Sequence, residues 1–150
     1  VESSAISFRE DSSNAAADHR RNRLRHEVLP LLCEVFERDV APIINRVADA
    51  ARRDNGCLDH LARDFARSDA LFELDGTLRL TPELLKAHPA IQSRILLGLL
   101  VDVAQCTGIG SREVEAALSM LKAGGPSKIN LPGGRHLRRK AKWLWVEPGG

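Results

Sequence analysis

Apolar residues recur every three or four positions along much of this 150-residue chain, a spacing typical of helices with one buried face. Over residues 40–65 they form a single stripe, which predicts a long amphipathic helix, with an interruption at Asn55-Gly56 left open. Over residues 91–103 apolar side chains occupy nearly every turn of the expected helix. The second pattern predicts the central helix of the fold.

Local signals place three further helices. The spacing of apolar residues around Leu24–Leu32 predicts a helix that ends or kinks at Pro30. Thr81-Pro82-Glu83 combines a cap, a proline at the first helical position and an acid in the first turn, which predicts a short helix. Ser111 is expected to cap the last helix.

Two regions have β character. Short apolar runs flank Asp75-Gly76, a dipeptide that accepts the positive φ angles of a tight turn, so a β-hairpin is predicted there. Residues 128–146 alternate apolar and basic positions around a Pro-Gly-Gly turn, which predicts a small C-terminal antiparallel sheet. The expected fold is therefore mainly α with small β elements, of the α+β class.

The end of the predicted sheet has two possible arrangements. If residues 135–146 form one strand, Trp143 and Trp145 lie on the face opposite Arg138 and Lys140. If the segment folds back near Lys140-Ala141, the turn itself is basic. Cations project from a small sheet in both arrangements. Whether the tryptophans belong to the core or stack on bases is left open.

Charge is distributed unevenly along the chain. Residues 116–150 carry 7 Lys or Arg and 1 acid, whereas residues 1–115 carry 15 cations and 19 acids. Arginine supplies 17 of the 22 cations, and its planar guanidinium matches two phosphate oxygens at once. An unbalanced basic stretch indicates a polyanionic partner, because each neutralised phosphate releases counterions.

The sequence carries few signs of chemistry. It has no glycine-rich phosphate loop of Walker type, no nucleophile elbow and no paired histidines at zinc spacing, so no catalytic or metal-binding residue is predicted. Three widely spaced cysteines suit neither a disulfide framework nor a zinc site. No apolar run is long enough for a bilayer, and the first residues lack signal-peptide features, so we expect a cytoplasmic protein without a membrane partner.

Two linked motifs resemble a known family. Glu10-Asp11-Ser12-Ser13-Asn14 precedes Arg21-Asn22-Arg23-Leu24-Arg25 and the sequence Leu29-Pro30-Leu31-Leu32. This arrangement is similar to that of tRNA(Ile)-lysidine synthases, just after their ATP-binding catalytic domain. The remainder resembles the family's middle, substrate-recognition domain. We therefore expect a junction segment over residues 1–38 and a helical tRNA-recognition domain over residues 39–150.

The resemblance implies a function for the parent enzyme. Such a ligase uses ATP and Mg²⁺ to activate the wobble cytidine of an isoleucine tRNA, and lysine then displaces AMP to give lysidine. The family's Ser-Gly-Gly-x-Asp-Ser loop does not occur in these residues, so this piece is expected to be inactive alone and to bind no cofactor itself. Its expected partners are tRNA(Ile) and the ATP-binding domain, and a homodimer with a second copy of this chain is left open.

Eight residues are predicted to contact tRNA. Three follow from the resemblance, which places them where the helix faces the catalytic domain and the tRNA: Arg21, Asn22 and Arg25. Five follow from the C-terminal charge: Arg135, Arg138, Arg139, Lys140 and Lys142. Two other functions remain open, a helical module that braces a neighbouring domain or dimerises, and a DNA-binding regulator that uses the helices around residues 91–123.

Overall fold

The computed structural model describes residues 19–148, which fall into two compact units. The units are Val1–Arg52 and Arg53–Gly150, and the division lies within helix α3 (Ala41–Ser68). The acidic motif at residues 10–14 lies outside the described residues. The expected domain boundary after residue 38 stays a prediction.

The first unit contains a helix whose hydrogen bonding changes near Pro30. Residues 19–23 are helical, and the π-helix η1 (Leu24–Val28) leads into α2 (Leu29–Val35), where the Leu29 N–H donates to the Leu24 carbonyl. Proline lacks the N–H that would bond the preceding turn, and the wider π-turn accommodates its ring. The helix continues past Pro30, so the predicted end is wrong, and the alternative of a kink at Pro30 stays a prediction.

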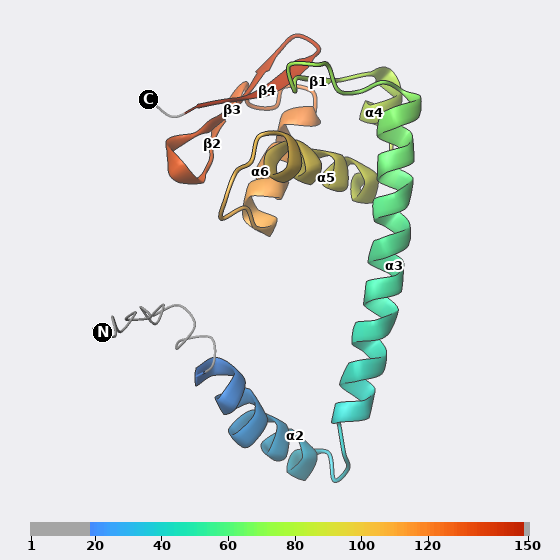
Figure 1. Ribbon diagram of the computed structural model, residues 1–150, viewed down its shortest axis with the longest axis vertical. Helices are drawn as coiled ribbons and strands as arrows, with labels where there is room; N and C mark the ends of the chain where they lie inside the picture. The colour runs from blue at the N-terminus through green and yellow to red at the C-terminus, as the bar shows by residue number, and fades with distance from the viewer. Residues whose placement is uncertain (1–18, 149–150) are drawn as a thin grey trace, which may run out of the picture. The chain divides into compact units, whose positions relative to one another are not determined.

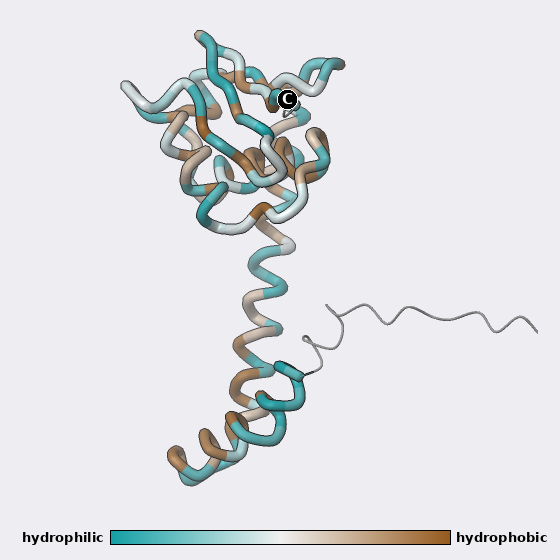
Figure 2. Tube along the Cα trace, turned by 90° about the vertical axis from the view of Figure 1, so that its left-hand side faces the viewer, coloured by the Kyte–Doolittle hydropathy of each residue, from teal (hydrophilic) through white to brown (hydrophobic). Residues whose placement is uncertain are grey.

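Helix α3 confirms the long helix predicted from the apolar stripe. It runs without interruption through Asn55 and Gly56, and the Asp39 carboxylate accepts a hydrogen bond from the Ala41 N–H at its start. Figure 2 shows hydrophobic residues recurring along its length. The alternative with a break at Asn55-Gly56 is therefore wrong.

The second unit contains one four-stranded antiparallel sheet in the order β1-β4-β3-β2 (Figure 1). Its strands are β1 (Leu78–Arg79), β2 (Lys128–Asn130), β3 (His136–Lys140) and β4 (Trp143–Glu147). The predicted hairpin is confirmed by a bridge between Phe72 and Leu78 and by Gly76, whose φ is 82°. Because β1 also pairs with β4, the hairpin and the C-terminal sheet form one β-structure.

Helices cover one face of this sheet (Figure 1). They are α4 (Pro82–Lys86), α5 (Pro89–Gly98), the π-helix η2 (Leu99–Val103) and α6 (Ser111–Leu121). Leu99, Leu100 and Met120 from the helices are fully buried together with Leu137 and Leu144 from the sheet. The mainly α fold with small β elements and the central apolar helix are thus confirmed.

Side chains fix the starts of two helices. The Thr81 hydroxyl accepts a hydrogen bond from the Leu84 N–H at 3.1 Å, as the Thr-Pro-Glu signal predicts. Ser111 is already the first residue of α6, so the prediction that it caps the helix is wrong by one position. The Gly110 N–H donates to the Glu113 carboxylate at 2.9 Å, and this hydrogen bond lowers the pKa of Glu113.

Candidate nucleic-acid interface

The C-terminal basic segment folds back on itself. β3 and β4 are joined through Ala141, with φ at 52°, and Lys142. Their register pairs Lys140 with Trp143 and Arg138 with Trp145. Paired residues of an antiparallel sheet project to the same side. The arrangement with one long strand is wrong, and the tryptophans share a face with the cations.

This face of the sheet, which we call the outer face, lies opposite the core. The register of the sheet places nine residues on it: Arg79 of β1, Lys128 and Asn130 of β2, His136, Arg138 and Lys140 of β3, and Trp143, Trp145 and Glu147 of β4. Residues at the alternating positions, Leu137 and Leu144, are fully buried beneath it. All four strands therefore contribute cations or aromatic rings to one surface.

Most cations of the outer face are available to a ligand. Within residues 19–148, Lys128 and Lys140 are exposed and have no carboxylate partner, and the same holds for Lys142 in the turn. The Lys142 ammonium lies 5.3 Å from the centroid of the Trp143 ring, within range of a cation–π interaction. Only Arg138 is paired, through its Nε at 2.8 Å from a Glu147 carboxylate oxygen.

Two predicted contact residues instead bond to helix ends. Arg135 donates through Nη1 to the Ala104 carbonyl and, at 3.4 Å, to the Cys106 sulfur. Arg139 donates to the carbonyls of Met120 and Lys122, at the end of α6. Carbonyls at a helix C-terminus carry partial negative charge, so both guanidinium groups stabilise the packing of the helices on the sheet. Their contact with tRNA stays a prediction.

The other predicted contacts belong to the first unit. Arg21, Asn22 and Arg25 are exposed on the helix that leads into α2. On the same helix the Arg23 Nε lies 3.0 Å from a Glu27 carboxylate oxygen, an exposed pair one turn apart. The structure thus brings Arg138, Lys140 and Lys142 together in one unit and these three residues together in the other.

A groove of about 570 Å³ opens beside the two tryptophans. Trp143 and Trp145 form one wall, and Glu73, Leu74, Asp75 and Thr77 of the β-hairpin loop form the other. Leu74 is fully exposed. The Thr77 N–H donates to the Asp75 carboxylate at 2.9 Å, which lowers the pKa of Asp75 and keeps it ionised.

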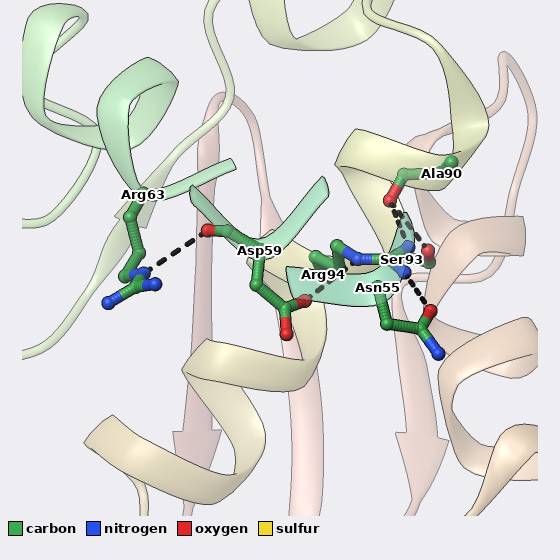
Figure 3. Close-up of polar contacts among 6 residues, drawn as sticks. All are labelled: Asn55, Asp59, Arg63, Ala90, Ser93 and Arg94. Atoms are coloured by element: carbon green, nitrogen blue, oxygen red, sulfur yellow. Dashed lines mark hydrogen bonds and ion pairs between the residues drawn. The ribbon is translucent and has the colours of Figure 1, made fainter. Parts of the chain in front are cut away.

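A network around Arg94 fixes the C-terminal half of α3 against α5 (Figure 3). The Arg94 Nε lies 2.8 Å from an Asp59 carboxylate oxygen, and Nη2 donates to the side-chain amide oxygen of Asn55 at 2.6 Å. Nη1 donates to the Ala90 carbonyl at 3.1 Å. This network borders a second groove, of about 470 Å³, and no motif in the sequence indicated it.

Other kinds of site have little support in the described part of the chain. Across residues 19–148 no group of three or more His, Cys, Asp or Glu side chains could hold a metal ion. Cys33, Cys57 and Cys106 are all unpaired. Among the same residues no helix combines the length and the apolar character that crossing a membrane requires.

Comparison with known proteins gives consistent relatives, although no protein-family model matches the chain. A tRNA(Ile)-lysidine synthase of Thermosynechococcus vestitus is 30% identical over 148 residues, covering 90% of this chain. The synthase of Streptomyces coelicolor is 30% identical over 93% of the chain, and that of Rhodococcus jostii is 34% identical over 74%. The chain spans between 33% and 40% of the length of these relatives.

Proposed function

We propose that this chain, which belongs to the tRNA(Ile)-lysidine synthase family, provides part of the surface that holds the tRNA substrate. The resemblance implies that the whole enzyme uses ATP to join lysine to the wobble cytidine of tRNA(Ile), as a ligase that modifies tRNA in the cytoplasm. The Ser-Gly-Gly-x-Asp-Ser loop does not occur in these 150 residues. The chemistry is therefore assigned to another part of the enzyme.

The observation that carries this proposal is the register of the sheet. It aligns Lys128 with Arg138 and places Lys140 on the same face, beside Lys142 in the turn. Among the described residues only Arg138 of these cations has a carboxylate partner, Glu147, so most of this charge is not neutralised within the chain. A surface of unpaired cations favours a phosphate backbone, because binding releases the counterions condensed on the nucleic acid.

The proposal also separates binding from catalysis. ATP and Mg²⁺, which the resemblance implies for the whole enzyme, need a different set of ligands. Mg²⁺ takes oxygen ligands, usually carboxylates together with phosphates and water. The outer face offers mainly ammonium and guanidinium groups and indole rings, and its carboxylate, Glu147, is paired with Arg138, so this set does not suit that ion. We assign both cofactors to the rest of the enzyme and tRNA backbone contacts to this chain.

Salt dependence tests the proposal. We replace Lys128, Lys140 and Lys142 with alanine and measure binding of end-labelled tRNA(Ile) by fluorescence anisotropy from low to physiological salt. Each phosphate contact contributes roughly 0.7 to 0.9 to the slope of log affinity against log salt, so the triple variant should lose about 2 to 3 from it.

A matched control removes the same charge elsewhere. Arg53, Lys86 and Arg112 are exposed and lie on helices α3, α4 and α6 rather than on the sheet. Their replacement with alanine should leave the slope close to that of the parent chain. Equal slopes for both triple variants would contradict a tRNA site on the outer face. Negligible tRNA affinity of the unsubstituted chain would contradict the proposed role in tRNA binding.

A second candidate function is bracing or dimerisation, which an apolar stripe in the first unit favours. Leu24, Val28, Leu31 and Val35 recur at intervals of four, three and four residues on the helix, and between 39% and 65% of each is exposed. This spacing places them on one helical face, as in helices that pack against a partner. Light scattering of the parent chain and of Leu31→Asp distinguishes the candidates: a dimer that the substitution dissociates, without loss of tRNA affinity, favours bracing.

A further inference from the structure

We propose that Trp143 and Trp145 form a stacking platform for unpaired nucleotides of the tRNA, with Lys140 and Lys142 binding the adjoining phosphates. This inference rests on the proposed function and specifies the part of the RNA that the outer face receives. Single-stranded nucleic acid is commonly bound where a cationic groove lies beside aromatic side chains that stack on successive bases.

The two indole rings do not belong to the core. Both residues are half-buried, and neither packs with the buried cluster that contains their neighbour Leu144. Among the described residues, neither indole N–H has a hydrogen-bond partner in the protein, and neither is enclosed. A core tryptophan normally has its N–H satisfied by the protein, so these rings are placed for an external ligand.

The position of the rings along β4 suits successive bases. Trp143 and Trp145 are separated by one residue, so they project from the same face about 7 Å apart along the strand. Each ring has a cationic neighbour across the strand pair: Lys140 is opposite Trp143, and Arg138 is opposite Trp145. A base that stacks on Trp143 therefore has the unpaired ammonium of Lys140 close by for its phosphate, whereas the guanidinium beside Trp145 is already paired with Glu147.

Opposite charges on the two sides of the rings orient the nucleotide. Lys140 lies on one side of the rings, across the strand pair, and the Lys142 ammonium lies over the Trp143 ring. On the other side, Arg79 is opposite Trp143 with its guanidinium bonded to the Asp69 and Ala70 carbonyls, and the groove wall carries Glu73, Asp75 and Thr77. Carboxylates repel phosphates but accept hydrogen bonds from the amino groups of bases. The backbone is thus directed toward the lysines and the base edges toward the hairpin loop.

The same features select unpaired over paired RNA. In an A-form duplex the bases are stacked on one another and the major groove is too narrow for side chains. An indole ring can reach a base face only where the base is unstacked, as in a loop or at an end. The lysines alone would bind either form, so the preference for single strands depends on the tryptophans.

The composition of the chain supplies a direct assay. It contains 2 Trp and no Tyr, so intrinsic fluorescence reports on these two rings alone. We titrate the chain with tRNA(Ile), with a single-stranded oligouridylate and with a blunt-ended, fully paired RNA duplex of equal charge. We expect quenching by the first two probes and little by the paired duplex.

Single substitutions assign the effect to each ring. Trp143→Ala and Trp145→Ala each leave one fluorophore, and each should weaken oligouridylate binding by about 5- to 150-fold, the range for loss of one stacked base. The salt slope should stay unchanged, because no cation is removed. The matched variants Trp143→Phe and Trp145→Phe should keep most of the affinity, and circular dichroism confirms that each variant folds.

The outcomes separate this inference from the proposed function. Binding of tRNA without quenching, or equal affinity for the paired duplex and the oligouridylate, would overturn the stacking platform and leave backbone binding in place. The absence of tRNA binding at every salt concentration would overturn both proposals. The platform is supported if the RNA quenches the fluorescence and if the alanine variants lose affinity while the phenylalanine variants keep it.

Discussion

Arg94 offers the most direct test of how the second unit holds together. Replacing it with methionine keeps most of the aliphatic stem and removes three hydrogen-bonding contacts, to Asp59, Asn55 and Ala90. The Arg94 side chain is only 19% exposed, whereas that of Asp59 is 57% exposed. Solvent screening at Asp59 limits the ion pair to about 0.5–1 kcal/mol.

The remaining contacts add to this value. A hydrogen bond from the half-buried guanidinium to the Asn55 side chain contributes about 1 kcal/mol, and the bond to the Ala90 carbonyl contributes less, since that oxygen lies inside a helix. We therefore expect Arg94→Met to lower the free energy of unfolding by about 2 kcal/mol. For a chain of this length, that loss corresponds to a fall in Tm of about 4–8 °C.

Urea denaturation followed by tryptophan fluorescence measures this loss within the unit that contains the sheet. A double-mutant cycle with Asp59→Asn isolates the ion pair, and we expect a coupling of about 0.5–1 kcal/mol between the two positions. A loss below about 0.5 kcal/mol for Arg94→Met would refute the view that this network fixes α3 against α5.

Two further predictions concern local structure. Gly76→Ala should lower the free energy of unfolding by about 1–3 kcal/mol, because φ is 82° there and a Cβ would lie 2.7 Å from Val103 Cγ1. Gly56→Ala in α3 should raise the free energy of unfolding by about 0.5–1 kcal/mol, because its Cβ would meet no atom within 4 Å. Urea midpoints that rank the two variants the other way would contradict this pair of predictions. The hydrogen bond from the Gly110 N–H lowers the pKa of Glu113 in the folded chain below its usual value of 4.5. The ionised Glu113 carboxylate therefore stabilises the fold above pH 4.5, and this contribution is lost as the pH falls through the folded pKa. Glu113→Gln should therefore reduce the acid sensitivity of the urea midpoint, and identical pH profiles for both proteins would disprove this linkage.

The elements that depend on neighbouring residues could be predicted from the sequence. The Thr81 cap and the turn at Asp75-Gly76 are set by a few adjacent side chains, and the structure confirms both. The end predicted at Pro30 failed because a π-turn accommodates the ring, which a rule about α-helices does not consider. The expected Ser111 cap failed because Glu113 caps from within the helix.

The outer face could be predicted only in part. Alternation along one strand correctly groups Arg138 with Lys140, but the side taken by the tryptophans depends on where the chain folds back. Lys128 joins the face through pairing with a strand that follows in the sequence, and the bonds from Arg135 and Arg139 to helix ends require the helices to be in place. Pairings between distant segments are not encoded in any short motif. The place of Lys128 on the outer face and the bonds of Arg135 and Arg139 to helix ends therefore could not be predicted from the sequence.

The pairing of β1 with β4 has a consequence during translation. Leu78 lies opposite Leu144, so a strand made early by the ribosome has only its hairpin partner, Phe72, until the first residues of β4 have emerged from the exit tunnel. A two-residue strand cannot persist alone, and closing so long a loop is slow. The nascent helices must therefore wait, with Leu71 and Leu78 open to solvent or to a chaperone, before the domain can close over its core.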